Sequence, residues 1–180
     1  MIMNKFKIAG LSLLAIGAVV LLNSCGVKVP ENISVVKDFD VKSYEGKWYE
    51  IARFDFKHEK DLKNVTANYT LNDDGSITVE NKGFNYIKNE WQEVKGKAKF
   101  NGNETEGALK VSFFGPFYSG YNVVAMDPAY ENVLVFGQNT DYIWILSRNK
   151  TIPQKVKDKF VAQAKEAGYD LDRMVWTEQD

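Results

Sequence analysis

The amino-acid sequence predicts an all-β protein, an eight-stranded antiparallel up-and-down β-barrel with one C-terminal α-helix and a ninth strand. Three observations support this fold class. Eight short segments between residues 46 and 148 alternate apolar and polar residues with period two, turn residues separate them, and a later segment changes to the helical period. Consecutive antiparallel strands joined by short turns close most simply into a barrel. No internal repeat or long insertion suggests a second domain, so residues 38–180 are expected to form a single domain.

The expected strands are short and closely spaced. They span residues 46–54, 64–72, 76–84, 91–100, 107–114, 120–127, 132–138 and 141–148. The Asp-Gly pair of "NDDGS" and the Asn-Gly pair of "FNGNETEG" are typical of hairpin turns. The connection "FDFKHEKDLKN" between the first two strands is longer, and a ninth strand is expected at residues 172–179.

Residues 151–168 carry the helical pattern. Their apolar side chains fall on one stripe, formed by Val156, Phe160, Ala164 and Ala167. Thr151 and Gln154 fit a capping box, Pro153 is expected in the first turn, and Gly168 is expected to end the helix. The helix should therefore pack this stripe against the outside of the barrel.

Alternation along the strands predicts which side chains face the barrel interior. Small inward residues, namely Ala67, Gly96 and Ala98, leave room for a cavity, although large residues opposite them would instead fill the interior. Ala125 is also expected to face inward. The residues expected to contact a ligand are Ala67, Tyr69, Val79, Val94, Ala98, Val111, Phe113, Tyr121, Val123, Val135, Tyr142 and Trp144.

The first 24 residues have the layout of a secretory signal. Two lysines, Lys5 and Lys7, precede an apolar run over residues 8–22, and the small polar residues Asn23 and Ser24 follow it. This run is short for a membrane span. A cleaved signal peptide is therefore expected over residues 1–24.

The single cysteine, Cys25, follows this segment directly. Residues 22–26 resemble the lipobox of bacterial lipoproteins, which implies that diacylglycerol is attached to the thiol and that an acyl group such as palmitate is attached to the new amino terminus. A plain signal peptide or an uncleaved anchor helix with an incidental cysteine is the alternative. Residues 25–37 are expected to be the lipidated N-terminus and a tether, which leaves the protein anchored to a membrane by lipid.

Charge and composition exclude several functions. Removal of the signal takes away two basic residues and no acidic ones, so the net charge falls from −1 to −3, and no strong field for nucleic acid results. One cysteine and one histidine cannot form a clustered metal site. His58 lies in a charged loop and is expected to be solvated, and no Ser/His/Asp set is visible. An enzyme is therefore not expected, and neither is a cofactor.

Three motifs in order resemble the lipocalin family. Gly46 and Trp48 match its Gly-x-Trp signature, Thr140-Asp141-Tyr142 resembles its second motif, and Arg148 stands where the family keeps a basic residue over that tryptophan. The runs "GKWYEIARFDFKHEKDLKN" and "ALKVSFFGPFYSGYNVVAMD" are similar to those of the bacterial outer-membrane lipoprotein lipocalins (Blc type), close kin of the apolipoprotein D group. The resemblance covers residues 38–178. It implies that these motif residues are structural and that Arg148 stacks on Trp48 at the closed end of the barrel.

The resemblance implies that the protein binds and stores or transports a small hydrophobic ligand, such as a fatty acid or lysophospholipid, at the outer membrane of a bacterial cell envelope, where it supports membrane maintenance. A tetrapyrrole- or haem-binding lipocalin, or a lipocalin-type enzyme acting on a bound lipid, is the alternative. Inward tyrosines would offer hydroxyls to a head group or to one another, and Glu50 would be a structural acid or a ligand for an ammonium group.

The turn that contains Phe114, Phe117 and Tyr118 is expected at the open mouth, opposite Trp48. In an up-and-down barrel, alternate connections fall at the same end, so this turn joins the first connection there. These apolar residues at an aqueous rim would admit an acyl chain, fold over as a lid, or form the contact of a homodimer.

Overall fold

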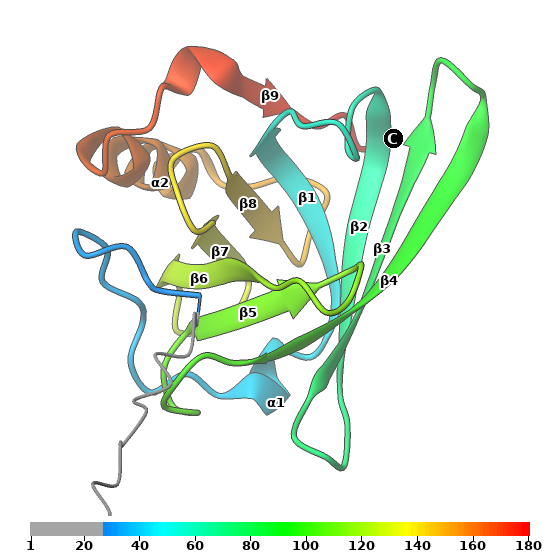
Figure 1. The fold of residues 1–180 in the computed structure, drawn as a ribbon. Coiled ribbons are helices and arrows are strands. Elements are labelled where there is room, and N and C mark those ends of the chain that lie inside the picture. Colours follow the sequence, from blue (N-terminus) through cyan, green and yellow to red (C-terminus); the bar gives the residue numbers. More distant parts are fainter. Residues whose placement is uncertain (1–26) are drawn as a thin grey trace, which may run out of the picture.

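A computed structural model describes residues 27–180 as a closed antiparallel barrel with a helix against its outer wall (Figure 1). The predicted signal peptide, the lipidation site Cys25 and Gly26 lie outside the described residues. The strands are β1 Gly46–Phe54, β2 Leu62–Leu71, β3 Ile77–Asn85, β4 Glu90–Phe100, β5 Ala108–Ser112, β6 Ser119–Met126, β7 Asn132–Phe136, β8 Ile143–Ser147 and β9 Met174–Trp176. Strands β2 to β8 pair in sequence order, β8 pairs with β1, and β1 also pairs with β2, which closes the ring.

The predicted fold class is confirmed, and each of the nine expected strands is present. Their ends differ by a few residues. Strand β5 ends at Ser112 and β7 at Phe136, two residues earlier than expected. At β7 the reason is the next turn, because the Gly137 N–H donates to the carbonyl of Tyr142 (2.8 Å) and starts the reversal there. Strand β9 is shorter than the alternation indicated and pairs with β1 through three residues.

Helix α1, Val41–Tyr44, was not predicted, because a single turn is too short to show a period. Asp40 caps it by accepting a hydrogen bond from the Lys42 N–H (3.0 Å). This turn carries Tyr44 across one end of the barrel, where its side chain is buried. Helix α1 therefore forms the floor of the barrel.

Helix α2, Gln154–Glu166, lies outside the barrel. Its predicted apolar stripe is confirmed: Phe160 and Ala164 are buried against the barrel wall, with Val156 and Ala167 packed beside them. The predicted capping box is wrong, because Pro153 occupies the N-cap position and no side chain caps the helix. Gly168 ends the helix as predicted, with a left-handed φ of +87°. A short 3-10 turn, η1 Leu171–Arg173, leads into β9, and no helix in residues 27–180 is long and apolar enough to cross a membrane.

Two β-bulges change which side chains face the interior. One lies in β1 between Glu50 and Ala52, and the other in β6 between Val123 and Ala125. A bulge adds one residue to one strand and so reverses the alternation beyond it. The predicted inward position of Ala125 is therefore wrong, since this side chain packs in the outer layer beneath α2. In β1 the same effect turns Arg53 inward.

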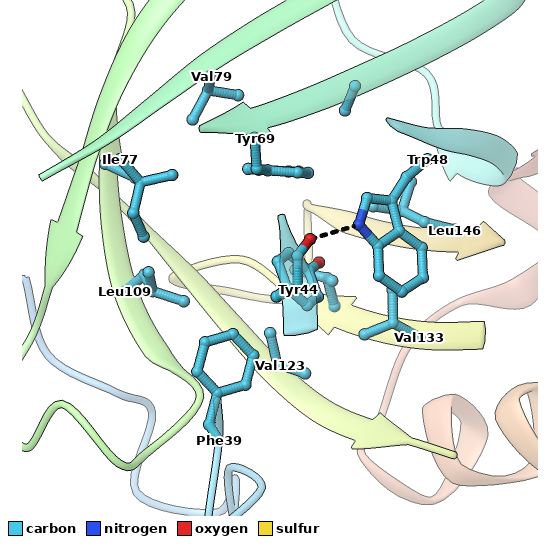
Figure 2. Packing of buried hydrophobic residues seen from close by; sticks show 13 residues of the cluster. Phe39, Tyr44, Trp48, Tyr69, Ile77, Val79, Leu109, Val123, Val133 and Leu146 are labelled. Atoms are coloured by element: carbon cyan, nitrogen blue, oxygen red, sulfur yellow. Dashed lines mark hydrogen bonds between the residues drawn. The ribbon is translucent and has the colours of Figure 1, made fainter. Parts of the chain in front are cut away.

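The closed end is built around Trp48. Its side chain is fully buried, and its indole N–H donates to the carbonyl of Tyr44 (2.9 Å), as Figure 2 shows. Arg148 lies over the indole with its guanidinium carbon 3.9 Å from the ring centroid, and it donates to main-chain carbonyls that include those of Lys47 and Glu45 (both 2.8 Å). The predicted stacking of Arg148 on Trp48 is therefore confirmed. Gly46, at φ +88°, makes the turn into β1 that this arrangement requires.

The segment before α1 runs along the closed end. The carbonyl of Val27 accepts from the side-chain amide of Asn101 (2.6 Å), and Val36 hydrogen-bonds through its main chain to Val123 and Gly107 (both 2.9 Å). Val35 is buried. The last residues of the expected tether therefore already belong to the packed domain.

Candidate functional site

A cavity of about 720 Å³ occupies the barrel interior above this floor. An eight-stranded barrel can either fill its interior with side chains or hold one small ligand, and this volume lies within the range of ligand pockets. Ten of the twelve residues expected to contact a ligand line the cavity: Ala67, Tyr69, Val79, Val94, Ala98, Val111, Phe113, Tyr121, Tyr142 and Trp144. The structure therefore contains the cavity rather than the filled interior that was the alternative.

Val123 and Val135 do not line the cavity. They are opposite each other in the β6–β7 pair, and both are fully buried in the packed cluster around Trp48 at the closed end. Their inward orientation was predicted correctly, but the alternation along a strand gives no information about depth. They belong to the floor of the barrel, and their predicted ligand contact is not supported.

Gly96 does not provide the space that its size suggested. A Cβ atom at this position would come within 2.7 Å of the Phe113 ring and 2.8 Å of the Ser112 carbonyl. The Phe113 ring therefore occupies the volume that Gly96 leaves free. The room in the cavity comes instead from Ala67 and Ala98, which both line it.

The cavity opens at the end opposite Trp48. Phe56, His58 and Glu59 of the β1–β2 connection line it together with Phe114 and Phe117 of the β5–β6 connection, so the two connections share one end as predicted. The side chains of Phe114 and Phe117 are 65% and 81% exposed, respectively, and form an apolar rim. His58 is exposed at the rim.

Aromatic rings line one wall from the mouth towards the floor. Tyr142 and Trp144 lie nearly parallel, at 15° and with centroids 6.2 Å apart, and Phe56 stands edge-on to both. The row of rings continues from Trp144 to Tyr121, and the centroids of these two rings are 6.5 Å apart. Rings of this kind give a rigid apolar surface for an acyl chain.

Three tyrosines meet near the floor of the cavity. The hydroxyl of Tyr121 lies 2.7 Å from that of Tyr44 and 2.8 Å from that of Tyr69, and all three residues line the cavity. Burial raises the pKa of each phenol, so all three stay protonated. The three hydroxyls thus form a hydrogen-bonded cluster in which Tyr121 contacts both of the others.

A buried ion pair borders the cavity, which Glu50 lines. The Arg53 guanidinium donates to the Glu50 carboxylate (2.6 Å), and Thr177 of the chain end donates to the same oxygen (2.6 Å). Glu50 is therefore the hydrogen-bonded structural acid of the first alternative. Arg53 was missed because the β1 bulge reverses the alternation before it. The only sequence signal was an arginine between the apolar residues Ala52 and Phe54 of β1.

Glu59 also lines the cavity and was not predicted, because it belongs to the loop, which has no alternation. One of its carboxyl oxygens accepts from the indole N–H of Trp144 (3.1 Å). Burial first, and then the charge of the Glu50 carboxylate, raises the pKa of Glu59 to about 8. Glu59 is therefore protonated at neutral pH.

The second predicted motif lies at the turn into β8. Tyr142 lines the cavity, while the Asp141 carboxylate accepts from Arg173 outside the barrel (3.0 Å) and Thr140 is exposed. This motif thus connects the mouth with the segment after α2. Within residues 27–180, no three His, Cys, Asp or Glu side chains group together in a way that could hold a metal ion.

Comparisons to known proteins assign the chain to a family. The model of the lipocalin-like domain matches residues 39–179. The chain belongs to the lipocalin family. Outer membrane lipoprotein Blc of Escherichia coli K12 is 51% identical over 150 residues, which cover 83% of this chain and 85% of that protein. Outer membrane lipoprotein Blc of Citrobacter freundii is 48% identical over 166 residues, which cover 92% and 94%.

Solved structures give the same fold. The crystal structure of Per a 4, a major allergen from cockroaches, superposes on this lipocalin with a TM-score of 0.66 at 22% identity, covering 85% of this chain and 96% of the allergen. At this identity the likeness concerns the fold alone.

Proposed function

We propose that this lipocalin is a lipid-anchored protein of the bacterial outer membrane that binds single-chain lipids, fatty acids or lysophospholipids, in its barrel cavity. The observation that carries the proposal is the cavity itself, a deep apolar space with a small number of polar groups and an apolar rim. The relatives named outer membrane lipoprotein Blc support the location. The protein acts by binding and release rather than by catalysis.

The position of Val27 supports an orientation. Val27 is held at the closed end by Asn101, and Cys25 precedes it by two residues, a reach of about 7 Å. A lipid on Cys25 would therefore draw the closed end towards the membrane surface. The mouth, with Phe114 and Phe117, would then point away from the anchoring membrane, where it can take up a lipid or meet a second copy of the chain.

A matched pair of substitutions on β4 tests the cavity as the lipid site. Ala98 is buried and lines the cavity, while its neighbour Lys97 points to solvent. We expect Ala98→Trp to fill the cavity and abolish binding of a fluorescent fatty acid, and Lys97→Trp to leave the affinity unchanged. Both proteins must be folded by circular dichroism. Equal binding by the two variants would show that the lipid site is not the barrel interior.

A further inference from the structure

We propose that Glu59 recognises the head group of the bound lipid by donating its carboxyl proton to an acceptor oxygen of an anionic head, a carboxylate or a phosphate. This inference rests on the proposed lipid-binding function and names the residue that determines head-group selectivity. It also predicts that binding weakens when Glu59 ionises.

The geometry of Glu59 leaves one carboxyl oxygen for a ligand. Trp144 holds the other oxygen through its indole N–H at 3.1 Å, which fixes the carboxyl group in the cavity wall. The Glu59 side chain is 13% exposed. The carboxyl group is thus a positioned polar group within a largely apolar space, as in pockets that orient one end of an amphiphile.

The charge of Arg53 lowers the pKa of Glu59, but by less than burial and the Glu50 charge raise it. The Arg53 N–H groups are already donated to Glu50 (2.6 Å), to Thr177 (3.1 Å), to Asp55 (2.9 and 3.2 Å) and to the main-chain carbonyl of Glu59 (2.7 Å). The Glu59 carboxylate lies 3.9 Å from the guanidinium, well beyond the Glu50 contact. Glu50 therefore keeps the charge and Glu59 keeps the proton.

Other charged groups near Glu59 do not change this result. The groups that face it are Glu50, Arg53 and Asp55 from β1 and its end, Tyr69 from β2, and, along the same cavity, His58, Lys82 and Glu93. The pKa of about 8 for Glu59 agrees with a group that donates a proton at neutral pH.

The test uses the full chain after removal of any lipid bound in the cavity. The ligands are cis-parinaric acid, a fluorescent fatty acid, and its methyl ester. Since about one-eleventh of Glu59 is protonated at pH 9, we expect the acid to bind about tenfold more weakly at pH 9 than at pH 6.5. The ester should bind equally at both pH values. Oleate and lysophosphatidylethanolamine then serve as competitors at both pH values. The competitor whose affinity falls about tenfold at pH 9 shows whether Glu59 recognises a carboxylate or a phosphate head.

Glu59→Gln keeps an N–H donor at this position but cannot titrate, so we expect it to bind the acid equally at both pH values. Glu90→Gln is the matched control, because Glu90 is exposed on β4, does not line the cavity and should leave the tenfold change intact. A pH-independent affinity of the unsubstituted protein for the acid, or a tenfold change that persists in a folded Glu59→Gln protein, would overturn the assignment of Glu59. Failure of the acid and the ester to bind at either pH would overturn the lipid-binding function as well.

Discussion

At the scale of single residues, the contact between Trp48 and Arg148 closes one end of the barrel. A cation over an indole face is favourable, and here it also places donors against the carbonyls of Ser43 in α1 and Lys47 in β1. The Gly-x-Trp motif and Arg148 lie about 100 residues apart in the sequence, so only the family resemblance predicted their contact. Glu59 and Arg53 had no such motif, and their roles depend on a loop and a bulge that composition does not reveal.

Trp48→Ala should destabilise the fold by about 3–5 kcal/mol, because it removes a fully buried aromatic side chain and leaves a space beneath Arg148. Arg148→Ala should cost less, since its side chain is only half-buried and water can solvate the released carbonyls. Chemical denaturation of both variants measures the difference. An unchanged free energy of unfolding in the Trp48→Ala protein would show that this residue does not close the barrel.

At the scale of elements, alternation predicted eight of the nine strands and most of the inward side chains. It failed after the bulges in β1 and β6, since one extra residue reverses every later position, and the sequence around Ala125 has no glycine or proline to indicate the change. Helix α2 was predicted by its stripe, while its capping box did not form because Pro153 takes the N-cap. Strands and helix are thus predictable from local pattern, and their irregularities are not.

Phe160 tests the role of α2. Its side chain is 2% exposed and packs on the outer barrel wall, so Phe160→Ala should destabilise the protein by about 3–5 kcal/mol. Lys159→Ala, one residue earlier and exposed, should change stability by less than about 0.5 kcal/mol. Because α2 lies outside the cavity, the folded Phe160→Ala protein should keep its affinity for a fatty acid. Loss of fatty-acid binding without loss of stability would contradict the view that α2 supports the outer wall and takes no part in the lipid site.

At the scale of the whole molecule, Val27 and the mouth lie at opposite ends of the barrel. The segment from Val27 to Val36 runs along the closed end, and Phe114 and Phe117 form the apolar rim at the other. The sequence predicted the anchor, the barrel and the rim separately. Their relative placement required the structure, because the fixing contact of Val27 with Asn101 joins residues far apart in the chain.

Cys25→Ser tests the anchor. We expect the substituted chain to fold but to move from the detergent phase to the aqueous phase on partitioning, because three acyl chains hold a protein to a bilayer much more firmly than the remaining contacts could. Labelling with radioactive palmitate should be lost in parallel. Unchanged partitioning with membranes would contradict lipidation at this cysteine.

The location of the lipid is tested most directly by quenching of tryptophan fluorescence with a brominated fatty acid, because bromine quenches only at short range. Trp144 lines the cavity, whereas Trp176 lies outside the barrel on β9, 42% exposed and beneath Lys157. In the unsubstituted protein, we expect quenching that rises to saturation as the lipid is added. Quenching should be lost in Trp144→Phe and retained in Trp176→Phe, while all three proteins bind the lipid. Quenching that survives in Trp144→Phe and disappears in Trp176→Phe would place the lipid on the outer surface and contradict a ligand held inside the barrel.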